Sequence, residues 1–280
     1  MTIKVVTDST ADLPRELAQE LDITVVPLNV HFGTQVFLDG VEIASEEFFR
    51  RLTSESVLPT TSQPSVGAMV QVYRDLAAEH SEIVSVHISS KLSGTVNSAL
   101  QAARELEGSK KKVEVVDSAQ ASAALGLVVV AAARAAQQGA SMAEVVATAQ
   151  RVSERIRVLF MVDTLEYLAK GGRIGKAQAF LGSLLRIKPI LTVQAGEIHP
   201  LERVRTRARA IERMWELAQE GAPYEGVAVA HATTPREAAD LAQRIQKLNK
   251  RGSVIECRFG PVLGTHVGPG ALGLAVQSAG

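Results

Sequence analysis

Short apolar runs alternate with helix-like segments through the first 160 residues, and this rhythm constrains the fold more than any other feature of the sequence. The strand-like runs occupy residues 3–6, 24–26, 83–88 and 113–116. Helical patterns lie between them, including segments from Ser65 to about residue 79 and from Thr95 to about residue 107. Such alternation is typical of a mostly parallel sheet with helices on its faces. We therefore predict an α/β fold.

The pattern changes after residue 160. Two apolar runs flank the turn at residues 194–196, which predicts a hairpin. The predicted strands are 158–162, 188–193, 197–204, 227–231, 254–259 and 271–276, and the predicted helices are 206–220 and 235–250. The 280 residues correspond to about two domains. We predict an N-terminal domain (1–157) whose mostly parallel sheet is flanked by helices, and a C-terminal α/β domain (158–280) with a mixed sheet. With no Pro/Ser-rich linker, the two should pack closely around a cleft.

Other segments of the N-terminal half give more local predictions. Residues 29–40 alternate around Gly33 and Thr34 and predict a second hairpin. Asp12 is predicted to cap a helix entered through Pro14, whereas residues 59–64 resemble a loop. The apolar stretch 119–136 is rich in alanine but contains polar residues, so it predicts a buried helix and not a membrane span.

Composition excludes several classes of protein. Thirty Lys and Arg residues balance thirty Asp and Glu residues, and aromatic residues make up 4% of the chain. A nucleic-acid-binding protein usually carries a basic excess and aromatic stacking surfaces, so we expect no nucleic-acid partner. The six histidines and the single cysteine, Cys257, lack metal-ligand spacing, so no metal site is expected. One thiol and the absence of a signal-peptide pattern predict a cytoplasmic protein with no integral membrane segment.

Three hydroxyl-rich loops are candidates for binding an anion. They cover residues 7–14, 60–65 and 89–95, and each follows a strand or precedes a helix. Hydroxyl groups and free backbone N–H groups at the carboxyl edge of a parallel sheet can bind a carboxylate or a phosphate. Each loop could instead consist simply of helix caps, and a single loop does not decide between these readings.

The C-terminal half adds two unusual segments. Residues 165–189 combine an apolar helix pair with glycines and cations, among them Arg173. Residues 260–273 resemble a Gly/Pro-rich loop that holds one histidine, His266. Histidine can donate a hydrogen bond to an anion, although a lone histidine is often structural. Arg203, Arg205, Arg207 and Arg209 form a basic cluster that is either solvated or able to dock an anionic partner protein.

The same residues leave an enzymatic alternative open. Ser93, His266 and Asp8 could form the catalytic triad of a serine acyl hydrolase, because a triad is defined by geometry and not by chain order. The residues around Ser93 do not match the nucleophile elbow G-x-S-x-G of α/β-hydrolases.

Five strings in order resemble the DegV family of bacterial fatty-acid-binding proteins. They are Thr-Asp-Ser-Thr-Ala-Asp-Leu-Pro (7–14), Thr-Ser-Gln-Pro-Ser (61–65), Leu-Ser-Gly-Thr (92–95), the segment 166–189, and Gly-Thr-His-Val-Gly-Pro-Gly-Ala-Leu-Gly (264–273). The resemblance spans nearly the whole chain and implies a two-domain DegV-like α/β fold. It also implies that a long-chain fatty acid such as palmitate binds between the domains.

The resemblance also implies roles for particular residues. Thr61 and Ser93 would bind the fatty-acid carboxylate with His266 close by, and the additional candidates for the pocket are Ser62, Gly94, Thr95 and Arg173. The chain would be a carrier in lipid transport or fatty acid metabolism, with no cofactor and no catalytic residue of its own. A partner, a dihydroxyacetone-kinase-like fatty acid kinase, would phosphorylate the carboxylate, and Arg203 and Arg205 lie near its expected docking surface. Val96 departs from the aromatic residue expected there.

Overall fold

The structure is a computed structural model that describes residues 3–106 and 111–279. Its first sheet has four parallel strands in the order β2-β1-β6-β7. The strands are β1 (Ile3–Asp8), β2 (Ile23–Val26), β6 (Glu82–His87) and β7 (Lys112–Asp117). Each coincides closely with one apolar run of the sequence, so the predicted parallel sheet is confirmed.

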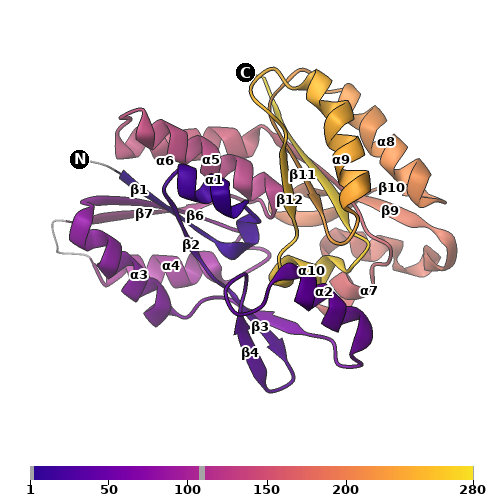
Figure 1. Ribbon diagram of the computed structural model, residues 1–280, viewed down its shortest axis with the longest axis horizontal. Coiled ribbons are helices and arrows are strands. Elements are labelled where there is room, and N and C mark those ends of the chain that lie inside the picture. Colours follow the sequence, from indigo (N-terminus) through magenta and orange to yellow (C-terminus); the bar gives the residue numbers. More distant parts are fainter. Residues whose placement is uncertain (1–2, 107–110, 280) are drawn as a thin grey trace.

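Helices cover both faces of this sheet (Figure 1). On one face, α3 (Val66–Glu79) and α4 (Thr95–Arg104) pack against β1, β2 and β6. On the other face lie α5 (Ala123–Gln137) and α6 (Met142–Glu154), while α1 (Arg15–Glu20) contacts β2. The prediction of a helix from Thr95 is confirmed, although its predicted last residue, 107, lies outside the described residues.

The second sheet is mixed and has six strands in the order β10-β9-β8-β13-β11-β12. They are β8 (Ile156–Met161), β9 (Lys188–Gln194), β10 (Glu197–Val204), β11 (Tyr224–His231), β12 (Ile255–Arg258) and β13 (Leu272–Ser278). Helices α8 (Arg207–Gln219) and α9 (Pro235–Ile245) pack on one face, and a short 3-10 turn, η3 (Gln246–Leu248), follows α9. The opposite face contacts α5, so the two sheets lie on either side of this helix.

A small third sheet has the order β4-β3-β5. Strands β3 (Asn29–Phe32) and β4 (Gln35–Leu38) form the predicted hairpin, and α2 (Ser45–Ser54) follows it. The prediction of a loop over residues 59–64 is wrong in part, because β5 (Thr60–Ser62) pairs antiparallel with β3. Three polar residues give no apolar run, and only pairing with β3 makes this segment a strand.

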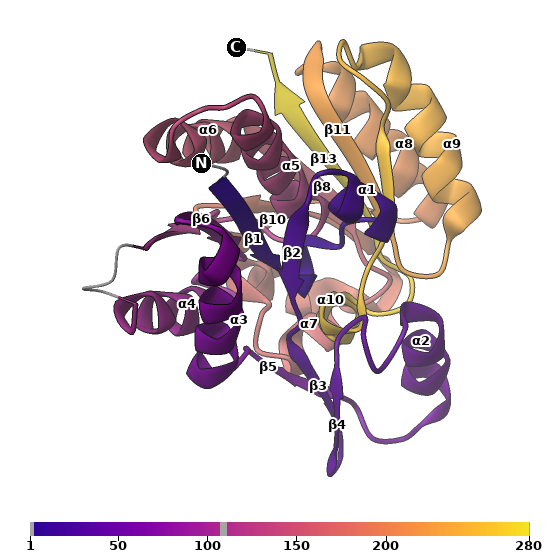
Figure 2. The same ribbon diagram turned by 60° about the vertical axis from the view of Figure 1, so that its left-hand side comes forward.

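The segment 260–273 is also not entirely a loop, because it contains α10 (Pro261–Val267). Proline suits the first turn of a helix, where its missing N–H costs nothing. A Cβ at Gly264 would lie 2.7 Å from side-chain atoms of Phe48 and Phe49, so the glycine lets α10 pack closely on α2. Figure 2 shows α10 between α2 and α7 (Glu166–Lys170). The expected helix pair of residues 165–189 consists of α7 and a 3-10 segment, η2 (Gly175–Arg186).

The predicted cap at Asp12 is wrong. Pro14 stands at the N-cap of α1 without a side-chain hydrogen bond, and Asp12 instead ends the 3-10 turn η1 (Ser9–Ala11) with a left-handed φ of 49°. None of the helices among the described residues is long and apolar enough to cross a membrane, and α5 is buried as predicted.

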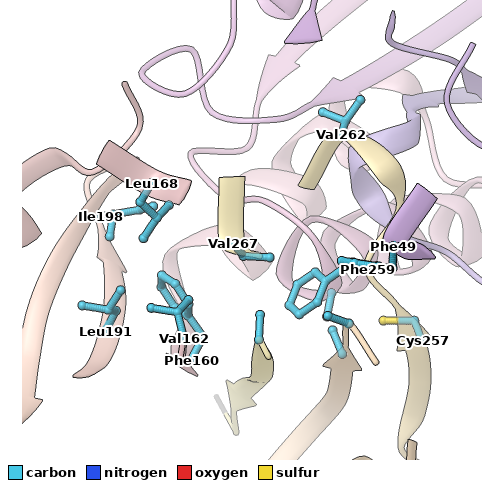
Figure 3. Packing of buried hydrophobic residues seen from close by; sticks show 14 of the residues in the cluster. Phe49, Phe160, Val162, Leu168, Leu191, Ile198, Cys257, Phe259, Val262 and Val267 are labelled. Atoms are coloured by element: carbon cyan, nitrogen blue, oxygen red, sulfur yellow. The ribbon is translucent and has the colours of Figure 1, made fainter. Parts of the chain in front are cut away.

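One hydrophobic cluster joins the two halves of the chain. Figure 3 shows Val262 and Val267 of α10 together with Phe160 of β8, Leu191 of β9 and Ile198 of β10. The cluster also includes residues of α2, β3 and the start of α5, which belong to the N-terminal half. The proposed division at residues 157 and 158 stays a prediction.

Candidate ligand-binding site

A cavity lies between the start of α5, the inner face of the mixed sheet, and α10. It encloses about 900 Å³ of space between atoms, part of it open to solvent. Its lining is mostly apolar, with Leu28, Ile88, Leu92, Ala121, Ala123, Ala124, Val158, Phe160, Leu168, Val193, Ile198, Ala230, Phe259, Val262, Leu263, Val267, Gly273, Leu274 and Ala275. Ligand sites in proteins commonly combine such a lining with a few placed polar groups.

The inner face of the sheet leaves room for this cavity because β11 and β13 carry small side chains there, among them Ala230, Gly273 and Ala275. Ala230 of β11 pairs with Gly273 of β13, which pairs with Phe160 of β8. The neighbouring residues Val229 of β11 and Leu159 of β8 point to the opposite face and pack under α8 and α9. Alternation of side chains along a strand therefore separates a packed face from a hollow one.

Polar residues of the lining come from segments far apart in the sequence. They are Thr61, Ser62 and Gln63 of the β5 region, Ser93 of the loop after β6, Ser122 before α5, Arg173 after α7, and His266 of α10. Thr61 Oγ1 and His266 Nε2 are 2.9 Å apart, although 205 positions separate them in sequence. The structure thus brings the second and third hydroxyl-rich loops to the cavity. None of the residues 7–14 lines it.

Gly94 and Thr95 lie next to the cavity without lining it. Thr95 Oγ1 hydrogen-bonds Ser93 Oγ at 2.8 Å, which holds the Ser93 side chain. A Cβ at Gly94 would lie 2.9 Å from Gln63 Nε2, so the glycine allows the two hydroxyl-rich loops to approach each other. Both residues therefore support the site without facing it.

His266 is almost fully buried and electrically neutral at pH 7. Burial, and secondarily the charge of Arg173, lowers the pKa of its imidazole to about 4. Its Nδ1 atom is buried and has no hydrogen-bond partner among the described residues. A buried N–H without an acceptor is rarer in proteins than a bare acceptor, so we assign the hydrogen to Nε2. His266 then donates to Thr61, and the hydroxyl hydrogen of Thr61 is left to donate to a ligand.

Arg173 brings a fixed positive charge to the cavity. Its Nε atom donates to the carbonyl of Leu92 at 3.1 Å, and Nη1 donates to the carbonyl of Gly171 at 2.8 Å. Arg173 also lines a second, more open hollow together with Lys91 and Lys176. The two carbonyls fix the guanidinium, so its charge attracts an anion to this end of the cavity while two of its nitrogens are already occupied.

The residues of the hydrolase alternative do not form a triad. The Asp8 carboxylate lies 2.9 Å from Nδ1 of His87, not against His266, and it also accepts from the N–H of Ile88. Within the described residues, the Ser93 hydroxyl bonds to Thr95 and not to His266. Without a base in contact with Ser93 and a carboxylate behind that base, nothing activates this serine as a nucleophile.

The arginines of the basic cluster are mostly engaged. Arg207 pairs with Glu237 at 2.6 Å and Arg209 with Glu216 at 2.5 Å. The guanidinium of Arg203 lies 4.3 Å from the centre of the Phe180 ring, while Arg205 is exposed. The cluster is therefore not one basic patch. Cys257 is buried, and the described residues contain no group of three or more side chains able to hold a metal ion.

Replacing Gly171 with alanine is expected to destabilise the fold by about 1–3 kcal/mol through overpacking. Its φ of −75° suits any residue, but a Cβ there would lie 2.2 Å from Nδ1 of His266 and force the imidazole to move. The matched control is Gly67→Ala in α3, whose nearest neighbour would be 3.9 Å away and which should stabilise the protein slightly. Urea denaturation measures both, and equal effects would contradict the close approach.

Replacing His266 with glutamine is expected to change how stability depends on pH. The folded-state pKa of about 4 lies below the unfolded value of about 6.5. The stabilisation from this depressed pKa is therefore complete above pH 6.5 and is lost as the pH falls towards 4. Relative to His266→Gln, the wild type should lose about 2 kcal/mol of unfolding free energy between pH 7 and pH 4.5. Denaturation titrations measure this difference, and one that stays constant with pH would refute the buried, neutral imidazole.

The fold and the site together define an α/β protein with an apolar cavity that is polar at one end. Comparison with known proteins identifies the family of this chain. The family model described as "Uncharacterised protein, DegV family" matches residues 2–279. A DegV domain-containing protein of Halalkalibacterium halodurans is 42% identical over 279 residues, which cover 98% of this chain and 97% of the relative. The chain belongs to the DegV family.

Two solved structures share the whole fold. A DegV family protein from Thermus thermophilus, whose structure is described as fatty acid binding, is 37% identical with a TM-score of 0.93. DegV from Bacillus subtilis, described as a fatty acid binding protein, is 36% identical with a TM-score of 0.89. Each comparison covers 100% of both chains. The α/β architecture implied by the sequence resemblance is thereby confirmed.

Proposed function

We propose that the chain is a carrier that binds one long-chain fatty acid, such as palmitate, in the cavity between the predicted domains 1–157 and 158–280. The observation that supports this most is an apolar cavity whose polar groups include Thr61, Ser93 and His266. Burial of each methylene contributes about 0.8 kcal/mol, so about ten buried methylenes give roughly 8 kcal/mol before ordering costs. The acyl chain supplies the affinity, and the polar groups orient the carboxylate.

In this proposal Thr61 and Ser93 donate hydrogen bonds to the carboxylate, with His266 fixing the direction of the Thr61 hydroxyl. The charge of Arg173 favours the ionised acid. Because Nε of Arg173 already bonds to the carbonyl of Leu92, this side chain does not form the side-on bidentate pair, which uses Nε and Nη2, with the carboxylate. An accessible carboxylate oxygen suits a carrier whose ligand must later react.

We further propose that a cytoplasmic partner, a dihydroxyacetone-kinase-like fatty acid kinase, phosphorylates the presented carboxylate. Gln63 lines the cavity and is exposed, which places the polar end near the surface. Arg203 and Arg205, which are two positions apart and both exposed, are the cations of the proposed docking surface. The loaded chain with such a kinase and ATP should give an acyl phosphate that hydroxylamine traps, whereas trapping by the chain alone would contradict a non-enzymatic role.

Native mass spectrometry and lipid extraction of the purified protein test the binding function. We expect one fatty acid per chain. A protein that is free of lipid and also fails to bind palmitate in solution would contradict the proposal.

A further inference from the structure

Helix α10 carries His266 near its C-terminal end, and two buried carboxylates hold its N-terminal end. The backbone N–H of Gly260, at the N-cap, donates to Asp12 Oδ1 at 2.8 Å. The backbone N–H of Val262 hydrogen-bonds Asp39. Pro261 between them has no N–H, so these bonds satisfy donors that the first turn of a helix otherwise leaves unpaired. Both carboxylates come from the N-terminal half of the chain, far from α10 in sequence.

The two carboxylates are themselves fixed by hydroxyl groups. The Ser9 hydroxyl donates to Asp39 Oδ2 at 2.7 Å, and the Ser122 hydroxyl donates to Asp12 Oδ2 at 2.5 Å. A Cβ at Gly260 would lie 3.1 Å from Asp12 Oδ1 and 3.2 Å from Asp39 Oδ1, so both carboxylates pack directly against the start of the helix. The first hydroxyl-rich loop, residues 7–14, does not line the cavity. Through Asp12 it contacts the start of α10, the helix that carries His266.

Helix α10 is short and held at both ends. His266 is six positions after Gly260 in the sequence, which corresponds to roughly 9 Å at the helical rise of 1.5 Å per residue. At the far end, the His266 imidazole bonds to Thr61 of β5. Val262 and Leu263 between these ends, and Val267 next to His266, line the cavity. A displacement of the first turn therefore moves the imidazole and the cavity wall together.

We infer that Asp12 and Asp39 are positioning residues for the carboxylate site, which they control by fixing α10 and thereby the His266–Thr61 hydrogen bond. The inference rests on the proposed fatty-acid function. Both side chains accept hydrogen bonds, and burial, the largest cause, raises the pKa of Asp12 well above its usual value and that of Asp39 to about 6. Asparagine keeps an acceptor oxygen in a side chain of the same shape, so substituting it for either aspartate should leave the position of α10 unchanged. A substitution that removes the acceptor should displace α10.

The test compares variants that keep or remove the acceptor. Asp12→Gly preserves the left-handed backbone of Asp12 and removes its carboxylate. Asp39→Ala removes the carboxylate of Asp39. Asp12→Asn and Asp39→Asn are the matched rescues. Asp22→Gly is the control, because Asp22 has a similar φ of 51° and its side chain is 73% exposed. NMR of labelled histidine rings in the ligand-free protein reports the position of His266, and binding assays give the ratio of palmitate to hexadecanol affinity.

We expect Asp12→Gly and Asp39→Ala to shift the His266 ring signals and to lower the acid-to-alcohol ratio about tenfold. The two asparagine variants and Asp22→Gly should stay within twofold of the wild type. Unshifted signals, an unchanged ratio, or equal loss of acid and alcohol would overturn the inference. If the wild type binds neither ligand, the proposed function is wrong. The histidine ring signals then still show whether Asp12 and Asp39 fix the position of His266. Should neither acceptor-free variant fold, Gly260→Ala displaces the same contacts from the helix side and must shift His266.

Discussion

Replacing both Thr61 and Ser93 with alanine is expected to raise the dissociation constant for palmitate about 100-fold. Each hydrogen bond to a charged group contributes about 1.5–3 kcal/mol, and the loss of both should cost about 3 kcal/mol after water partly replaces them. The acyl cavity is unchanged, so affinity for hexadecanol should fall much less. Isothermal titration or a fluorescent fatty-acid displacement assay measures both ligands.

The matched control for this double variant is Thr60→Ala with Ser90→Ala. Thr60 is next to Thr61, and Ser90 lies in the same loop as Ser93. Both residues are exposed, and neither lines the cavity. Palmitate affinity in the control should remain within twofold of the wild type. Unchanged binding in the Thr61 and Ser93 variant would contradict the assignment of the carboxylate site.

Replacing Ala275 with phenylalanine is expected to reduce palmitate affinity more than 100-fold without unfolding the protein. Ala275 lies on β13 opposite Val158 of β8, and both line the cavity. An aromatic ring there would occupy space that the acyl chain needs, whereas in the ligand-free protein it would fill a cavity with apolar surface. The melting temperature of the ligand-free variant should therefore be equal to or higher than that of the wild type.

A shorter ligand separates this steric effect from general damage. Decanoate affinity should fall less than palmitate affinity in Ala275→Phe, because a shorter chain needs less of the cavity. Ala78→Phe makes the same chemical change on the exposed surface of α3 and should alter neither affinity. Retained palmitate binding with a folded Ala275→Phe protein would place the acyl chain elsewhere.

Much of the fold was predictable because apolar patterning is a local property. The strands of both large sheets follow runs of apolar residues, and the hairpin of β9 and β10 follows a turn between two such runs. Helix α6 was not predicted, although the Ser141 and Glu144 capping box marks its start in the sequence. The two misassigned segments have a different cause. Strand β5 exists only through its pairing with β3, and α10 contains glycine where α2 allows no larger side chain.

The site was predictable in its residue types but not in its geometry. Hydroxyl-rich loops and an isolated histidine indicate an anion site, yet nothing local shows that Thr61 and His266 touch across 205 positions. Asp12 illustrates the limit most clearly. Its position before a helix predicts a cap of α1, whereas the tertiary structure makes it a partner of α10, which follows much later in the chain. The local sequence predicts that Asp12 accepts a hydrogen bond from a helix N-terminus, but it does not show which helix donates that bond.

The most direct measurement is a crystal structure of the protein with palmitate bound. We predict that the carboxylate lies within hydrogen-bond distance of Thr61 Oγ1 and Ser93 Oγ, with the acyl chain running between the start of α5 and strands β8, β13 and β11. A palmitate in the opposite orientation, with its carboxylate beside Ala275, or one bound outside the cavity, would contradict the account.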